Sequence, residues 1–94
     1  MGRMFNPPHP GEVLREFLPD DMTIEEIARR LSISRVQLSR ILNGHSAISA
    51  DMAIRIGLLT NTTPESWLNG QMRWDLWGAA QKPIPEVDPL RQAA

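Results

Sequence analysis

Two short helical patterns in the middle of the chain are separated by only two residues. The first begins at a capping box, Thr23–Glu26, and continues to Leu31. The second begins at Ser34 and ends at Asn43-Gly44, a typical left-handed helix stop. The connection, Ser32-Ile33, is so short that the two helices must pack against each other across a tight turn. This arrangement is typical of a helix-turn-helix.

The rest of the chain carries further helix signals and almost no strand signals. It has no run of alternating β-branched residues with a hairpin turn. Proline or a capping residue marks each further helix start, and the three helices expected from these signals are Pro10–Leu18, about Ser49–Leu59 and about 63–80. We therefore predict an all-α protein with one five-helix domain over residues 9–80. An N-terminal arm, residues 1–8, precedes this domain, and a proline-rich tail, residues 81–94, follows it as an extended or disordered segment.

Positive charge is concentrated in the middle of the chain, although the formal net charge is only −1. Residues 29–55 hold five arginines against one aspartate, whereas residues 1–28 hold two arginines against six acids. Nine of the ten basic residues are arginine, whose forked guanidinium suits bidentate contacts to phosphate and guanine. The alternative is that these arginines are solvated charges that form surface salt bridges.

The second central helix has two chemically different sides. Its apolar side is formed by Leu38, Ile41 and Leu42. The opposite side is formed by Val36, Arg40 and Asn43, flanked by Arg35 and Ser39. A recognition helix in the DNA major groove needs such a face, because arginine reads guanine and a small apolar side chain contacts the thymine methyl.

The segment TIEEIARRLSISRVQLSRILNG resembles the DNA-binding core of the Cro and phage-repressor-like family. The resemblance implies that the following residues face the DNA bases: Ser34, Arg35, Val36, Ser39 and Arg40. It implies phosphate contacts for Thr23, Arg29 and Asn43. His45, just after the helix stop, could also touch a phosphate, or could be a simple loop histidine. One departure from the family pattern is Ser32, which stands where many members have glycine.

Both flanks of this core resemble HigA-like antitoxins, also called VapI-like proteins. The segments are HPGEVLREFL (residues 9–18) and ISADMAIRIGLLTNTTPESWLNGQMRWDLWGA (residues 48–79). The resemblance implies a DNA-binding antitoxin that binds a HigB-type mRNA-cleaving toxin and represses their shared operon as a dimer. The alternatives are a stand-alone phage- or plasmid-type repressor and a protein-interaction module that has lost DNA binding.

The last expected helix, about residues 63–80, has more apolar surface than a monomer needs. One stripe is formed by Leu68, Met72, Leu76 and Ala79, and a second by Trp67, Trp74 and Trp77. Together they span more than the 100° that a surface helix of a monomer buries. We therefore expect a homodimer with an interface formed by Trp67, Gly70, Trp74 and Trp77, bound to an inverted-repeat operator. Alternatively, the first helix and the tail cover both stripes.

Several other classes of function have little support. The chain has no cysteine and no apolar stretch of about 20 residues. The N-terminus lacks the apolar segment of a signal peptide, so a cytoplasmic protein is expected. His9 and His45 have no Cys, Asp or Glu at ligand spacing, and no nucleophile–base pair or Gly-rich phosphate loop is present. No metal, cofactor or enzymatic activity is expected.

Overall fold

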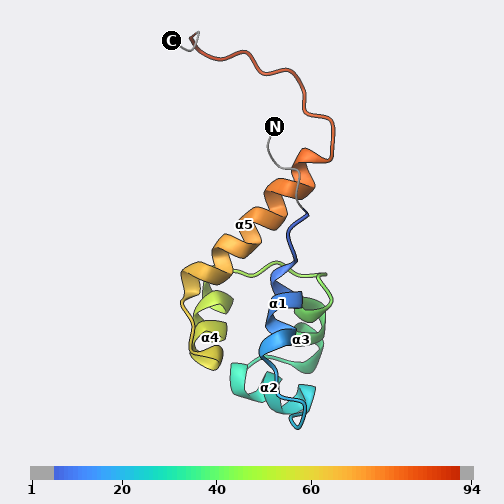
Figure 1. Ribbon diagram of the computed structural model, residues 1–94, viewed down its shortest axis with the longest axis vertical. Coiled ribbons are helices and arrows are strands. Elements are labelled where there is room, and N and C mark those ends of the chain that lie inside the picture. The colour runs from blue at the N-terminus through green and yellow to red at the C-terminus, as the bar shows by residue number, and fades with distance from the viewer. Residues whose placement is uncertain (1–5, 92–94) are drawn as a thin grey trace.

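The computed structural model describes residues 6–91, and this part of the chain is all-α (Figure 1). The first 5 residues of the expected N-terminal arm and residues 92–94 of the expected tail lie outside the described residues. The described helices are α1 (Pro10–Phe17), α2 (Ile24–Leu31), α3 (Arg35–Leu42), α4 (Ala50–Thr60) and α5 (Pro64–Ala80). They agree with the expected helices to within one or two residues at each end. The prediction of a five-helix domain is confirmed.

Each helix begins where its capping side chain satisfies a backbone N–H of the first turn. The hydroxyls of four N-cap residues accept from the N–H three positions further on: Thr23, Ser34, Ser49 and Thr63. The cap of α1 is His9, whose Nδ1 accepts from the Gly11 N–H at 2.9 Å. Only half of the expected capping box at α2 is formed, because the Glu26 carboxylate accepts from arginine side chains of its own helix.

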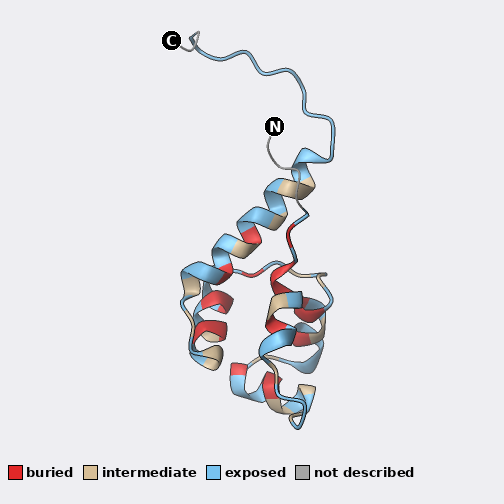
Figure 2. Cartoon of the chain, in the orientation of Figure 1, coloured by how far each residue is buried: buried red, intermediate tan, exposed pale blue. Residues whose placement is uncertain are grey.

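The core lies where α1, α2, α3, α4 and the first half of α5 face one another (Figure 2). Leu14, Leu38 and Ile56 have no measurable exposure, and Trp67 from α5 is 4% exposed. Helices α1 and α3 come close at Gly11, where an added Cβ would lie 1.9 Å from the Ile41 carbonyl oxygen. This approach needs a glycine, and it fixes α3 against α1.

The turn between α2 and α3 is held by both backbone and side-chain contacts. Ser32 adopts the left-handed conformation, with φ 60° and ψ 43°, which glycine adopts at lower cost. The Ile33 N–H donates to the Ala28 carbonyl, and the Ile33 side chain packs against the core. From α4, the Arg55 guanidinium donates to the carbonyls of both Leu31 and Ser32, at 3.1 and 3.0 Å. These contacts fix the angle at which α3 leaves the turn.

The second half of α5 projects beyond the domain, and the tail bends after the helix and extends further away from the domain (Figure 1). The described chain measures 55 × 21 × 20 Å, and its radius of gyration is 16.6 Å. A compact domain of this length would have a radius of gyration of about 12 Å. Residues 82–91 form no helix or strand, and all are exposed. No helix in the described part of the chain is long and apolar enough to cross a membrane.

Candidate nucleic-acid interface

Helix α3 presents the expected polar face to solvent. Leu38, Ile41 and Leu42 are buried, and the Val36 side chain is 67% exposed on the opposite side. Ser34, Arg35 and Arg40 are exposed, and Ser39 is half-buried. The Ser34 hydroxyl accepts from the Gln37 N–H at 3.0 Å and keeps its own proton, which it can donate to a phosphate or a base.

The two arginines expected to read bases are held by acceptors of their own chain. The Arg35 Nε donates to the Glu25 carboxylate at 2.8 Å, and both side chains are well exposed. The Arg40 guanidinium donates to the Ser46 hydroxyl at 3.3 Å and to the His45 carbonyl at 3.4 Å. These are weak, exposed contacts that a guanine can replace. In the free protein, these contacts hold both arginine side chains close to α3.

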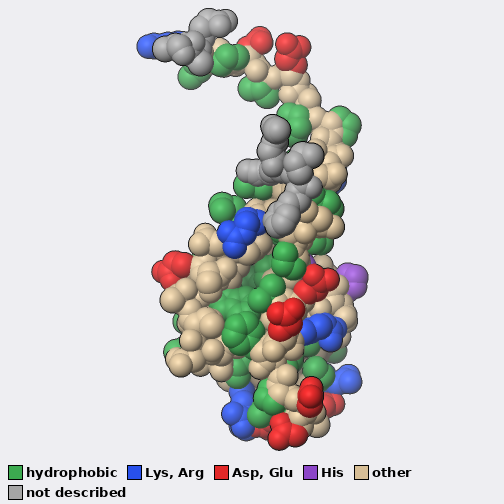
Figure 3. Space-filling model, viewed as in Figure 1, with side chains coloured by type: hydrophobic (Ala, Val, Ile, Leu, Met, Phe, Trp, Pro, Cys, Tyr) green, Lys and Arg blue, Asp and Glu red, His purple; other side chains and the backbone are tan. Residues whose placement is uncertain are grey.

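An acidic side chain on α2 neutralises much of the nearby positive charge. The Glu26 carboxylate accepts from both Arg29 and Arg30, at 3.0 and 2.9 Å. The hydrogen bond from Arg29, followed by that from Arg30, lowers the pKa of Glu26 to about 2, and the same pair raises the pKa of Arg29. Acidic and basic side chains are accordingly interleaved over α2 in Figure 3. Arg29 therefore offers a phosphate less net charge than the sequence suggests.

The residues expected beside the phosphates lie at helix ends. Thr23 is exposed at the N-terminus of α2, where backbone N–H groups and the helix dipole favour an anion. Asn43 and His45 are exposed just after α3, with Gly44 between them at φ 76°. The structure brings these residues to the ends of α2 and α3, and their contacts to DNA stay predictions.

Arg15 organises this end of α3, and the sequence analysis missed it. Its Nε donates to the Leu42 carbonyl at 3.1 Å, and its Nη2 donates to the Asn43 side-chain oxygen at 2.8 Å. The Asn43 amide nitrogen then donates to the Ser39 hydroxyl at 3.3 Å. Arg15 lies 27 residues before Leu42 in the chain, so no local pattern could have indicated this contact.

Gln37 is a second residue that the sequence analysis passed over. It stands three residues after Ser34, the spacing of a capping box. Within the described chain its side chain forms no hydrogen bond, and it is exposed. A free glutamine amide can donate to and accept from the edge of adenine. Gln37 therefore joins the candidates for base contacts.

This geometry matches a known family of DNA-binding proteins. The family model described as "Helix-turn-helix" matches residues 14–68, which include α2, the turn and α3. The chain belongs to the helix-turn-helix family. An HTH-type transcriptional regulator of Escherichia coli, YddM, is 34% identical over 96% of this chain and 95% of its own length.

Two solved structures show the same fold over most of this helix-turn-helix protein. One is an addiction module antidote protein of the HigA family from Coxiella burnetii, 40% identical, with a TM-score of 0.76 over 82% of this chain and 86% of that one. The other is the Pseudomonas aeruginosa antitoxin HigA with the higBA promoter, 37% identical, with a TM-score of 0.78 over 90% and 99%. The resemblance to HigA-type antitoxins is confirmed.

The dimer interface expected on α5 loses Trp67, whereas Gly70, Trp74 and Trp77 stay predictions. Trp67 is a core residue with 4% exposure in a single chain, so it has almost no surface left for a partner. An added Cβ on Gly70 would lie 3.7 Å from Pro10 of the same chain. Trp74 is half-buried and packs its ring edge-on against His9, with centroids 5.2 Å apart, and Trp77 stacks beside Trp74 at 5.8 Å.

The other stripe of α5 is the one that faces solvent. Leu68, Met72 and Leu76 are 36%, 50% and 46% exposed. The alternative that the first helix and the tail cover both stripes is therefore wrong. The tryptophan stripe packs against its own chain over its first half, and the leucine and methionine stripe stays open.

Proposed function

We propose that this protein is a sequence-specific DNA-binding antitoxin of the cytoplasm that represses its own operon and neutralises a HigB-type mRNA-cleaving toxin. The observation that carries the DNA-binding half is the exposed polar face of α3, fixed by contacts from α1, α2 and α4. The similarity to a HigA antitoxin with its promoter supports the same role.

In the proposed complex, α3 enters the major groove with its exposed face toward the bases. Arg35 and Arg40 leave their intramolecular acceptors and donate to guanine O6 and N7, and Val36 packs against a thymine methyl. The Ser34 hydroxyl, at the N-terminus of α3, donates to a base edge. The Thr23 hydroxyl, at the N-terminus of α2, donates to a phosphate and fixes the register. Each recognition helix would read about four or five base pairs.

Replacement of Arg40 tests this orientation of α3. Arg40→Ala should weaken binding to the native operator by about 1–3 kcal/mol and weaken binding to random DNA much less, because a base contact is lost. Fluorescence anisotropy on both DNAs at one salt concentration measures the difference. Lys82→Ala removes an exposed positive charge just after α5, far from α3 in the chain, and serves as the matched control. Equal losses on both DNAs would make Arg40 a phosphate contact and would contradict the proposal.

We place the dimer interface of this repressor on the open stripe of α5, Leu68, Met72 and Leu76. These side chains face away from the core, and the helix projects far enough for a second copy to pack against it. Met72→Glu should give monomers in sedimentation experiments while the helical circular dichroism persists, because a buried charge opposes association. Leu58→Glu, at an 81% exposed residue of α4, is the matched control. A Met72→Glu protein that still dimerises would exclude this stripe.

A symmetric dimer of this kind requires a symmetric operator. Two recognition helices meet one face of B-DNA at major grooves about 34 Å apart, so half-site centres should lie about 10 base pairs apart in an inverted repeat. Five additional base pairs between the half-sites turn the second groove to the far side and should abolish tight binding. Footprints unchanged by that insertion would mean that the monomers bind independently.

The toxin-binding half of the proposal rests on the similarity to HigA antitoxins alone. If the gene beside this one encodes a toxin, its expression should arrest growth, and co-expression of this protein should restore growth. Copurification of the two proteins checks that rescue is direct. Operator binding without rescue would leave a stand-alone repressor as the function.

A further inference from the structure

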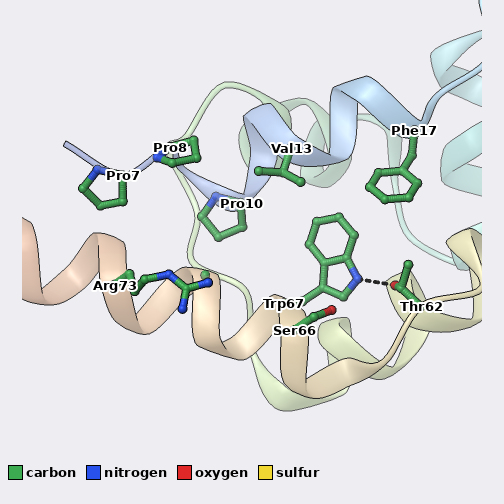
Figure 4. Close-up of a pocket in the computed structure, with 10 residues that line it drawn as sticks. Pro7, Pro8, Pro10, Val13, Phe17, Thr62, Ser66, Trp67 and Arg73 are labelled. Atoms are coloured by element: carbon green, nitrogen blue, oxygen red, sulfur yellow. Dashed lines mark hydrogen bonds between the residues drawn. The ribbon is translucent and has the colours of Figure 1, made fainter. Parts of the chain in front are cut away.

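A small apolar pocket lies between α1 and α5 and has no role in the proposed DNA contacts. Its volume is about 280 Å³, and it is lined mainly by proline and aromatic side chains from Pro7 to Trp67 (Figure 4). The indole Nε1 of Trp67 donates to the Thr62 hydroxyl at 2.7 Å, so the ring has no polar group left to satisfy. The pocket is smaller than the roughly 300–1,000 Å³ of small-molecule sites, and it suits a few side chains.

The surface around this pocket is also apolar. Phe17 of α1 is 46% exposed and packs beside Trp67, with ring centroids 5.7 Å apart. Hydrophobic side chains gather between α1 and α4 in Figure 3. At one edge of the pocket stands Arg73, which is exposed and forms no ion pair with a described residue. The pocket therefore offers aromatic and proline walls with one positive charge beside them.

The tail has the pattern of a ligand for such a pocket. Ile84, Val87 and Leu90 are spaced three residues apart, and they are 67%, 75% and 103% exposed. Prolines occupy positions 83, 85 and 89, so the segment favours the polyproline II helix, which has three residues per turn. In that conformation the three apolar side chains share one edge. Proline-rich segments of this kind bind aromatic-lined grooves because little chain entropy is lost on binding.

The charges of tail and pocket are complementary. Glu86 and Asp88 lie on either side of Val87 in the tail. Neither forms an ion pair with a described residue. A tail that places Val87 in the pocket would bring one of these carboxylates toward Arg73.

The tail is poorly suited to reach the pocket of its own chain. A return path along α5 requires the chain to reverse at Gln81 and Lys82, immediately after the helix. Lys82 precedes Pro83, which restricts it to extended conformations, and the further prolines keep the segment straight. The described tail accordingly continues away from the domain (Figure 1). In an antiparallel α5 pair centred on Met72, the end of one helix would instead lie beside the start of the partner's α5, so each tail would begin close to Thr62 and Ser66 of the partner's pocket.

We infer that the tail of one copy, residues 83–91, docks in the pocket between α1 and α5 of a second copy. This exchange goes beyond the proposed function and rests on its homodimer. It would add a second contact between copies that already associate through α5, and so raise the affinity of the dimer through a high effective concentration.

The absence of cysteine from this chain allows a direct test by disulfide trapping. One full-length chain carries Ser66→Cys at the pocket, and a second, differently tagged chain carries Val87→Cys in the tail. After mixing in a glutathione redox buffer, we expect a covalent dimer that contains both tags, because a disulfide forms only when the two Cα atoms approach to about 4.4–6.8 Å. Asp21→Cys, on the loop before α2, replaces Ser66→Cys in the control and should stay unlinked.

The outcomes of this test distinguish a failure of tail exchange from a failure of the proposed dimer. Sedimentation of the same mixture shows whether the chains associate. A dimer without the mixed disulfide would overturn tail exchange and leave the α5 interface intact. A monomer without the disulfide would overturn both. A chain that carries both substitutions and forms the disulfide internally would show that the tail docks on its own chain, and would also overturn the exchange.

A charge reversal gives a second, independent readout in full-length chains. Arg73→Glu on the pocket chain should lower the yield of the mixed disulfide at least fivefold, and Glu86→Lys with Asp88→Lys on the tail chain should do the same. Combining the two reversed chains should restore most of the yield. Arg73 and both acids are exposed, so the fold should persist in each variant. A yield unchanged by either reversal, or unrestored in the combination, would contradict this placement of the tail.

Discussion

The glycines of the helices provide a graded test of how closely the elements pack. An added Cβ would lie 1.9 Å from the Ile41 carbonyl oxygen at Gly11, and 2.8 Å from the Thr62 carbonyl oxygen at Gly57. At Gly70 the nearest atom of another described element would be the Pro10 Cγ, at 3.7 Å. The same Gly→Ala change should therefore have opposite effects along the chain.

The largest effect is expected at Gly11, because its neighbour is backbone. The contact falls about 1.5 Å short of the 3.4 Å at which ordinary contact begins, so α1 must move away from α3. Overpacking costs about 1–3 kcal/mol. The displacement also weakens the hydrogen bond from Arg15 to the Leu42 carbonyl, worth about 1 kcal/mol. The free energy of unfolding should fall by roughly 3 kcal/mol, a large part of the roughly 5–14 kcal/mol available to a domain of this size.

Urea denaturation, followed by circular dichroism at one fixed chain concentration, measures these differences. With an m-value of about 1.5 kcal/mol per molar urea, Gly11→Ala should lower the midpoint by about 2 M. Gly57→Ala should lower it less. Gly70→Ala should raise it, since alanine favours a helix over glycine by about 1 kcal/mol. A Gly11→Ala protein within 1 kcal/mol of the parent would refute the close approach of α1 and α3.

Three further predictions concern residues that hold the fold and the recognition helix. Burial lowers the pKa of His9 from its ordinary value of 6.5, although the charges of Glu12 and Asp75 oppose the shift. As the pH falls below 6.5, the unfolded chain therefore binds more protons than the folded chain, and the free energy of unfolding should fall. His9→Asn keeps the cap, and its free energy of unfolding, measured by urea titration between pH 7 and 5, should lose this dependence on pH. The left-handed conformation of Ser32 costs roughly 1 kcal/mol, so Ser32→Gly should raise the unfolding temperature by several degrees. A lower unfolding temperature would contradict this. Arg15→Met should weaken operator binding without unfolding the protein, because Asn43 and the end of α3 lose their support; unchanged binding by anisotropy would show that Arg15 is dispensable for DNA contact.

The sequence alone predicted most of the secondary structure, because helix starts depend on contacts three residues apart. Thr23, Ser34 and Thr63 cap their helices as expected from their spacing. The polar face of α3 was also predictable, since Leu38, Ile41 and Leu42 share one side of any helix with this sequence. Both signals are local, and a single element carries each of them.

The arrangement of side chains at the interface required the tertiary structure. Arg15 supports Asn43 from 28 residues away, and Glu25 of α2 pairs with Arg35 of α3 across the turn. These partners depend on how the helices are oriented in space, which no spacing within one helix reveals. The free amide of Gln37 was missed for a related reason, because a capping pattern does not show whether the side chain turns back.

The two stripes of α5 show the same difference between what the sequence predicts and what the tertiary structure decides. Their periodicity in the sequence indicated surplus apolar surface, and the structure confirms that Leu68, Met72 and Leu76 are open while Trp67 is buried. The sequence could not decide between the stripes, because both are apolar and both repeat at helical spacing. The choice was made by the rotation of α5 against α1 and α4, where Trp67 fills the space beside Phe17 and its indole meets the Thr62 hydroxyl. A helix can carry two apolar faces, but the shape of the core it meets accepts only one of them.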